Sequence, residues 1–156
     1  MKNVQPVWSR IGLGILALVI ALQLVPYGRA HTNPPVIAEP SWDAPGTREL
    51  ARQACFDCHS NETAWPVYAS IAPASWLVQH DVEDGRAALN FSEWSRPQKE
   101  ADEASEVVRD GEMPPRAYTL VHGHARLSPA DRDRLAQGLA RTIATAPVQV
   151  GQVRER

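Results

Sequence analysis

The two cysteines of the chain, Cys55 and Cys58, lie three residues apart in the stretch ACFDCHS, and His59 directly follows the second. Three kinds of chemistry use such a pattern: a redox-active dithiol, half of a zinc site, and covalent attachment of haem, for which Cys-x-x-Cys-His is the sequence signature. A disulfide between the two cysteines is a fourth alternative, although so small a loop would stabilise the fold little.

For a covalently bound haem, the sequence supplies both the attachment points and the iron ligands. The two thiols would form thioethers with the haem vinyl groups, and the imidazole of His59 would be the proximal ligand of the iron. Met113 is the one methionine besides Met1, and it lies between a glycine and two prolines in the stretch DGEMPP. A thioether on such a stiff loop suits the opposite side of the iron, so we expect one haem c with His59 and Met113 as metal ligands.

Further aromatic and histidine side chains are candidates for contacts with this haem. Trp76 and His80 lie four residues apart on one face of a predicted helix, which makes His80 a rival of Met113 for the distal position. His122 and His124 are two other rivals. Four tryptophans lie near the cysteine motif in the sequence: Trp42, Trp65, Trp76 and Trp94. Either a large flat ligand or an ordinary Trp-rich core would explain their number.

The segments that carry these residues are predicted to be helical. Thr47 is the expected N-cap of a helix that runs into the cysteine motif, and residues 72–73 are expected to open a second helix that Gly85 interrupts or ends. A third helix is expected over residues 98–110. The fold class is therefore all-α, and the order of attachment motif and methionine loop predicts a cytochrome c-like helical domain around the haem.

The last predicted helix has the clearest signals, because Ser128 and Asp131 form a capping-box-like start and Leu135, Leu139 and Ile143 follow at four-residue spacing. No segment alternates as a β-strand does. A thioredoxin-like dithiol is expected near a strand-helix-strand pattern, which is not visible here. A structural zinc site needs four ligands, and the chain has no second cysteine pair to supply them. The helical organisation therefore favours haem attachment.

The N-terminal residues have the pattern of an export segment. Lys2 and Arg10 precede an apolar run over residues 11–25, which Pro26 ends. This run is close to the lower limit of about 17 residues for a membrane span. The basic flank predicts an anchor in the bacterial inner membrane with the following domain in the periplasm. The alternative is cleavage after the weak site at residues 28–30, which would leave a soluble periplasmic protein.

Four segments are expected along the chain: an anchor or signal segment (1–30), a Pro-rich tether (31–46), a haem-binding domain (47–146) and a short tail (147–156). From residue 31 onward, thirteen Lys and Arg side chains stand against eighteen Asp and Glu. This composition argues against nucleic-acid binding, since phosphate recognition needs a basic patch. The expected partners are the membrane and redox proteins that the sequence does not name.

Three stretches of the chain resemble the small haem-binding domain of exported and membrane-anchored bacterial proteins, which is related in motif to cytochrome c. The stretches are CFDCHSNETAWP, IAPASWLVQHDVEDGRAALNFSEW and GEMPPRAYTLVHGHARLS, within residues 39–143. The resemblance implies that Cys55, Cys58 and His59 bind the haem and that Met113 is the distal ligand. It also places five residues at characteristic positions, with Tyr118 expected to contact the cofactor: His80, Arg86, Asn90, Tyr118 and His122.

The sequence departs from this family at Val67, where a second tryptophan is expected after Trp65 and Pro66. This departure concerns packing at the haem edge and leaves the attachment motif intact. The expected function is electron transfer by a periplasmic c-type cytochrome rather than catalysis. The alternative is a haem-based gas or redox sensor, or a small haem peroxidase, in which Met113 is displaced and His80 or His122 acts in the distal pocket.

Overall fold

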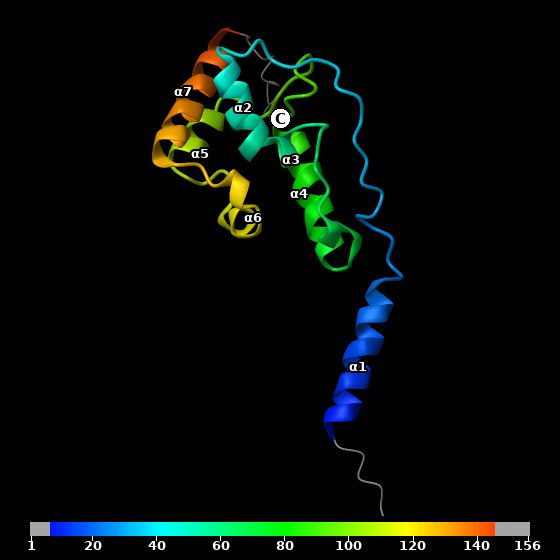
Figure 1. Cartoon of the computed structure of the whole chain (residues 1–156). Helices are drawn as coiled ribbons and strands as arrows, with labels where there is room; N and C mark the ends of the chain where they lie inside the picture. The colour runs from blue at the N-terminus through cyan, green and yellow to red at the C-terminus, as the bar shows by residue number, and fades with distance from the viewer. Residues whose placement is uncertain (1–6, 146–156) are drawn as a thin grey trace, which may run out of the picture. The chain divides into compact units, whose positions relative to one another are not determined.

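A computed structural model describes residues 7–145 of the chain (Figure 1). In it, residues 7–31 and 65–80 form one compact unit, and residues 32–64 and 81–145 form another. The predicted tail over residues 147–156 lies outside the described residues. The predicted all-α class is confirmed, because the described residues contain no strand beyond one isolated bridge between Ala38 and Glu93.

Seven α-helices and two short 3-10 helices make up the described part of the chain. The α-helices are α1 (Val7–Leu22), α2 (Pro45–Ala54), α3 (Phe56–His59), α4 (Ala74–Ala88), α5 (Ala104–Arg109), α6 (Arg116–Val121) and α7 (Pro129–Thr145). The 3-10 helices are η1 (Val67–Ser70) and η2 (Gly123–Ala125).

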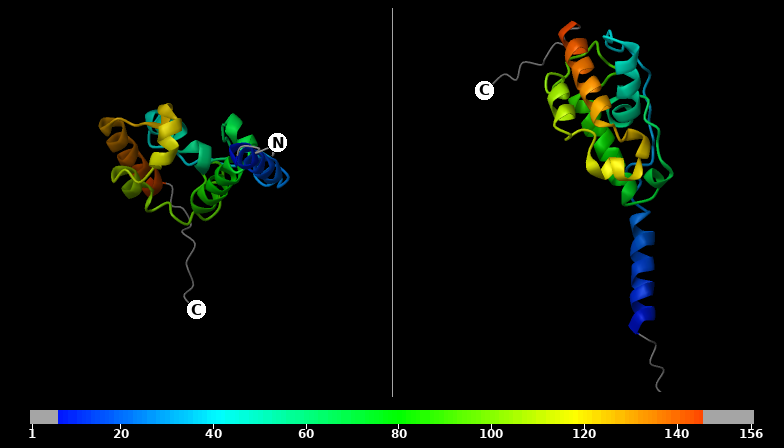
Figure 2. Two further views of the ribbon diagram at one scale, coloured as in Figure 1. Left: turned by 90° about the horizontal axis from the view of Figure 1, so that it is seen from below. Right: turned by 60° about the vertical axis from the view of Figure 1, so that its left-hand side comes forward.

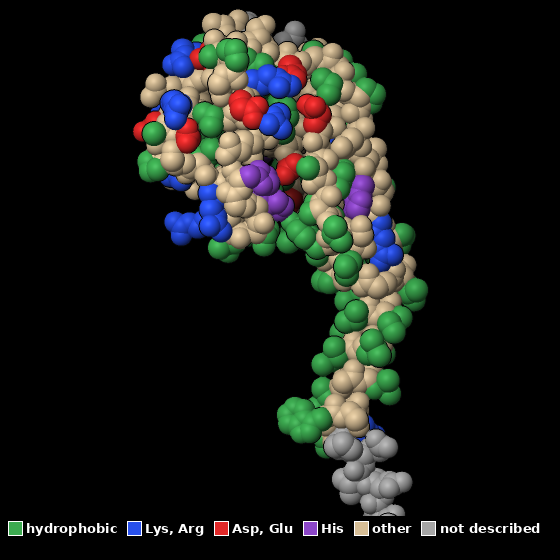
Figure 3. Space-filling model, viewed as in Figure 1, with side chains coloured by type: hydrophobic (Ala, Val, Ile, Leu, Met, Phe, Trp, Pro, Cys, Tyr) green, Lys and Arg blue, Asp and Glu red, His purple; other side chains and the backbone are tan. Residues whose placement is uncertain are grey.

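In the first unit, the side chain of Gln23 ties the chain after α1 to the segment before α4. Its Nε2 donates to the carbonyl of Ala72 at 2.9 Å, and its Oε1 accepts from the Ala72 N–H at 3.0 Å. The helix ends at Leu22 and has 16 residues, a length of about 24 Å at 1.5 Å per residue. None of its residues is buried, and hydrophobic side chains lie along the face seen in Figure 3.

The predicted transmembrane helix over residues 11–25 is not confirmed. Among residues 7–145, no helix combines the length and the hydrophobicity that a membrane span requires. The apolar run of the sequence extends to Val25 and is broken only by Gln23, whereas the α-helix ends at Leu22 and residues 24 and 25 form tighter turns in which each N–H bonds to the carbonyl three residues earlier.

The core of the second unit lies where α7 packs against α2 and α5 (Figure 1, Figure 2). Leu135 and Leu139 are fully buried there, as their spacing predicted. The predicted start of α7 is also confirmed, because the backbone N–H of Asp131 donates to the hydroxyl oxygen of Ser128 at 3.1 Å. Ile143 packs against the core while remaining partly buried.

The predicted N-cap of the first helix of this unit is wrong. Helix α2 begins at Pro45, so Thr47 lies inside it and is buried against α7. A Cβ atom at Gly138 would lie only 2.2 Å from the hydroxyl oxygen of Thr47. Close packing of α2 on α7 therefore requires a glycine at this position and assigns Thr47 to the helix contact instead of a cap.

Two other helix boundaries differ from the prediction. Gly85 neither interrupts nor ends its helix, since α4 continues to Ala88. The helix expected over residues 98–110 forms only from Ala104 to Arg109. Its first turn is missing because Gln98 is buried and uses its side chain to bond the backbone of Asn90 and Glu93.

The segment predicted to be a tether is extended, but it also packs on the second unit. The N–H groups of Ile37 and Ala38 donate to the carbonyl of Ser92 at 2.8 and 3.1 Å. Farther along, the carboxylate of Glu39 accepts two hydrogen bonds from the guanidinium of Arg48, at 2.6 and 2.7 Å. The indole Nε1 of Trp42 donates to the same carboxylate at 2.7 Å. These contacts fasten the segment to the start of α2.

Glu39 should make the stability of this attachment depend on pH. The hydrogen bonds from Arg48, helped by Trp42, lower the pKa of Glu39 from its ordinary 4.5 although burial opposes the shift. A carboxyl group whose pKa is depressed by folding stabilises the native state above pH 4.5 and loses this contribution as the pH falls further. Glu39→Gln should therefore lower the free energy of unfolding by about 1–2 kcal/mol near pH 7, and the loss should shrink below pH 4.5, as urea titrations across pH can measure.

Glu49→Gln is the matched control for this prediction, because Glu49 pairs with Arg52 on the exposed side of α2. It should change the unfolding free energy by less than Glu39→Gln. Equal effects of the two variants at every pH would contradict the role assigned to Glu39.

Candidate functional site

The cysteine motif occupies the junction between α2 and α3 in the second unit. The N–H of Cys55 still donates to the carbonyl of Ala51 at 2.8 Å, and the N–H groups of Cys58 and His59 donate to the carbonyl of Cys55 at 3.1 and 2.9 Å. The motif is therefore one helical turn, and its backbone hydrogen bonds fix the positions of the two cysteines. The cysteines are not joined by a disulfide, so the disulfide alternative is not realised in this structure.

The surroundings of the two thiols favour their protonated form. Burial, with a smaller contribution from Cys58, raises the pKa of the Cys55 thiol to about 12. Burial also raises the pKa of the Cys58 thiol to about 12, and the carboxylates of Asp81 and Asp57 add to this shift. A reactive dithiol and a zinc site both need thiolates, which this environment disfavours. Within the described residues, no group of three or more His, Cys, Asp or Glu could hold a metal ion.

The imidazole of His59 is oriented by contacts with the backbone of Gly85 and Leu89. Its Nδ1 lies 3.1 Å from the carbonyl oxygen of Leu89. Because a carbonyl only accepts, Nδ1 must carry the proton, and Nε2 keeps a lone pair for a ligand bond. Burial lowers the pKa of His59 and so favours the neutral ring. A neutral imidazole beside two unpaired thiols is the donor set that a covalently attached haem requires.

Gly85 allows α4 to approach the cysteine motif closely. A Cβ atom at this position would lie 2.5 Å from the carbonyl oxygen of Cys58 and 2.9 Å from its Cβ. Any larger residue would push α4 away from the motif. The glycine that sequence reasoning interpreted as a helix breaker is therefore a packing residue beside the candidate site.

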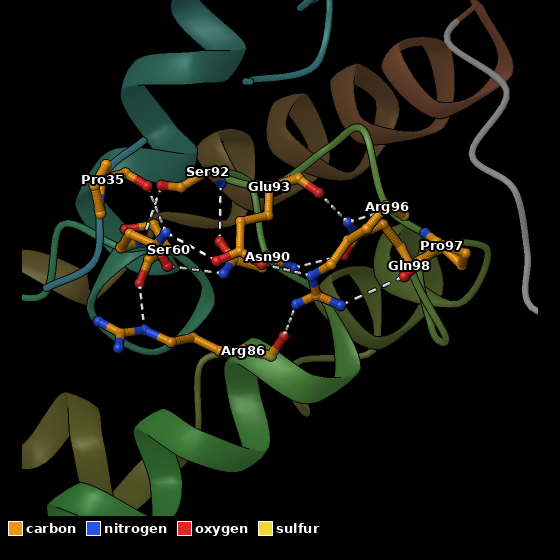
Figure 4. Close-up of polar contacts among 10 residues, drawn as sticks. Pro35, Ser60, Arg86, Asn90, Ser92, Glu93, Arg96, Pro97 and Gln98 are labelled. Carbon is orange, nitrogen blue, oxygen red and sulfur yellow. Dashed lines mark hydrogen bonds and ion pairs between the residues drawn. The ribbon is translucent and has the colours of Figure 1, made fainter. Parts of the chain in front are cut away.

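Buried amide side chains fix the turn after His59 to the end of α4 (Figure 4). Asn90 Nδ2 donates to Asn61 Oδ1 at 2.9 Å, and the Asn90 N–H donates to the side-chain oxygen of Gln98 at 2.8 Å. Ser92 closes the loop, because its N–H donates to Asn90 Oδ1 and its hydroxyl oxygen accepts from the Asn61 N–H, both at 2.9 Å. We call these four residues the amide network: Asn61, Asn90, Ser92 and Gln98. All four are buried.

Arg86 supports the same turn from α4. Its Nε donates to the carbonyl of Ser60 at 2.8 Å (Figure 4), and its Nη2 donates to the hydroxyl of Thr63 at 3.0 Å. Burial lowers the pKa of the Arg86 guanidinium. Two of the positions that the resemblance singled out, Arg86 and Asn90, thus hold the backbone after His59 in place.

Tyr118 reaches the cysteine motif through Asp57, which lies between the two cysteines. The phenol hydroxyl donates to Asp57 Oδ2 at 2.5 Å, and the other carboxylate oxygen accepts from the Ala64 N–H at 2.9 Å. The ring of His122 stacks on Tyr118 with centroids 4.1 Å apart, and His124 meets His122 edge-on. Sequence analysis missed Asp57, for which its place inside the motif was the one available signal.

The remaining predicted site residues are Met113, Trp76 and His80. Met113 lies on the loop between α5 and α6, where its N–H donates to the Val107 carbonyl at 3.1 Å. The residue is 37% exposed. Trp76 and His80 lie in the first unit. The assignments of Met113, Trp76 and His80 to the haem therefore stay predictions.

The four tryptophans near the motif are divided between the two units. Trp42 and Trp94 belong to the second unit. Both pack on Phe91, with ring centroids 5.1 and 5.8 Å away. Trp65 belongs to the first unit and stacks on His31 at 4.9 Å. At least two of the four therefore serve the hydrophobic core, which was the ordinary explanation for their number.

Comparison with known proteins links the chain to one family. No curated protein and no solved structure matched the chain. A haem-binding domain family, in contrast, matches residues 17–141, which include the cysteine motif, the amide network and the methionine loop. The chain is a member of the haem-binding domain family.

Proposed function

We propose that the protein is a c-type cytochrome that carries one covalently attached haem and transfers electrons outside the cytoplasm. Cys55 and Cys58 would hold the haem as thioethers, and His59 Nε2 and Met113 would bind its iron. The bound haem would supply one-electron chemistry by changing between ferrous and ferric iron. The observation that carries the proposal is the hydrogen bond of His59 Nδ1 to Leu89, directly beside two unpaired thiols.

Each residue of the site has a part in this function. Burial keeps the two thiols protonated until they react. The Leu89 carbonyl fixes the tautomer and the ring orientation of His59. A ligand held by such contacts moves little when the charge on the metal changes, which suits electron transfer. The hydrogen bond between Tyr118 and Asp57 links α6 to the cysteine motif and so limits the movement of α6 relative to the motif.

Export of the domain is part of the proposal, because haem is attached to such motifs outside the bacterial cytoplasm. Arg10 near the start of the apolar helix α1 supports a role of this segment in export. Electron donors and acceptors would then be other exported or membrane redox proteins.

Covalent attachment is tested by extraction with acidic organic solvent. Protein matured in a bacterium that makes c-type cytochromes should keep its pigment after extraction, because thioethers survive denaturation. The double variant Cys55→Ser, Cys58→Ser should lose it to the solvent. A chain lacking residues 1–30 should acquire no covalent haem, since it would stay in the cytoplasm. Complete release of haem from the unaltered protein would overturn the covalent attachment.

Met113 is tested by substitution with alanine. If its thioether binds the iron, Met113→Ala should abolish the sulfur-to-iron charge-transfer band of the oxidised protein, lower the reduction potential and let carbon monoxide bind the reduced haem. His80→Ala and His122→Ala serve as controls and should keep the band.

Two results would contradict the assignment of Met113. If Met113→Ala keeps the low-spin spectrum and His80→Ala or His122→Ala becomes high-spin, a histidine is the distal ligand. If the unaltered protein is already high-spin and binds carbon monoxide readily, a sensor or peroxidase function replaces electron transfer.

A further inference from the structure

A positively charged pocket lies in the second unit, between the loop that follows α5, helix α6 and the first turn of α7. Its volume is about 340 Å³. Three of its lining residues are Arg116, Arg126 and Arg132, and Asp110 is the one carboxylate among them. Acidic side chains outnumber basic ones over the rest of this unit, where the two signs are interspersed on the visible face (Figure 3). The pocket therefore has a local charge opposite to that of the domain.

None of the three arginines is neutralised by an acidic partner. Ion pairs within residues 7–145 include those of five other arginines: Arg48, Arg52, Arg96, Arg134 and Arg141. Arg126 donates instead to two backbone carbonyls, from Nε to Thr119 at 2.8 Å and from Nη2 to Leu120 at 3.2 Å. These bonds hold its guanidinium in place and leave its charge uncompensated.

Arg132 has the least favourable surroundings of the three. Its Nε atom is buried and has no hydrogen-bond partner, and a buried charged donor without an acceptor destabilises a fold. The residue lies in the first turn of α7, where the helix dipole also disfavours a positive charge. Its Nη1 lies beside Gly111, at 3.0 Å from where a Cβ atom would be. An anion in the pocket would offset both costs.

We propose that this pocket binds a small diffusible oxyanion of the carboxylate or phosphate class. Guanidinium groups bind both classes through paired N–H donors, and the fixed position of Arg126 lowers the entropy lost on binding. Met113 lines the same pocket, so a bound anion would contact the methionine loop. The proposal does not depend on whether Met113 binds the iron.

The methyl group of Met113 gives a direct test, because the chain has two methionines and the other is Met1. The purified full chain, labelled with ¹³C at the methionine methyl groups, is titrated separately with citrate and with inorganic phosphate. One of the two anions should shift the Met113 signal in a saturable manner, and the one that binds more tightly identifies the class. Arg126→Gln and Arg132→Gln should each weaken binding about tenfold.

Arg134→Gln is the matched control, because it removes the same charge from α7 while Arg134 is paired with Asp131 and does not line the pocket. It should leave the affinity unchanged. A Met113 signal that neither anion shifts in a saturable manner would overturn the proposal, and so would equal weakening by all three variants. If Arg132→Gln does not fold, as circular dichroism would show, Arg126→Gln decides the question alone.

Discussion

The hydrogen bond between the side chains of Asn61 and Asn90 is the interaction on which the candidate site depends. It joins the turn that follows the cysteine motif to the loop that follows α4, and both residues are buried. Removing one partner would leave the other unsatisfied in the core, at a cost of about 1–3 kcal/mol for each polar group. The contact also places the Phe91 N–H against the carbonyl of His59, at 2.8 Å.

Several features of the site follow from this constraint. With the two loops joined, the Leu89 carbonyl lies within hydrogen-bond distance of His59 Nδ1. The helix that ends in this loop must then pass very close to Cys58, which only a glycine at position 85 permits. The orientation of His59 and the packing of α4 on Cys58 are therefore two consequences of one arrangement. A substitution that alters one of them should also alter the other.

The sequence predicted the parts of the structure that depend on local chemistry. The helix that runs into the cysteine motif and the cap at Ser128 rest on residues close together in the chain, and both were found. Thr47 and Gly85 were misinterpreted because their roles are set by contacts with Gly138 and Cys58 from distant segments. Local sequence rules interpret such a threonine as an N-cap and such a glycine as a helix breaker. Tertiary packing gave both residues other roles.

The site itself was predictable only in part for the same reason. The three residues proposed to bind haem could be selected from their spacing, but the groups that orient them act through backbone carbonyls and amides that no spacing rule reveals. Leu89 acts on His59 through its backbone carbonyl. Asp57 occupies one of the two positions of the motif at which any residue is allowed, so the motif assigns it no role. The extended segment before α2 was predicted to be a free tether because its prolines are typical of linkers. Sequence rules do not predict the backbone hydrogen bonds that Ile37 and Ala38 make.

The central claim is that the fold holds His59 with a protonated Nδ1 and an Nε2 available to iron. The most direct measurement is a nitrogen-proton NMR spectrum of the reduced, haem-loaded protein labelled with ¹⁵N-histidine. The account predicts a slowly exchanging proton on His59 Nδ1 and none on Nε2, with the Nδ1 proton exchanging faster when Asn90→Ala breaks the amide network. A protonated Nε2, or a His59 Nδ1 proton that exchanges as fast as that of an exposed histidine, would contradict it.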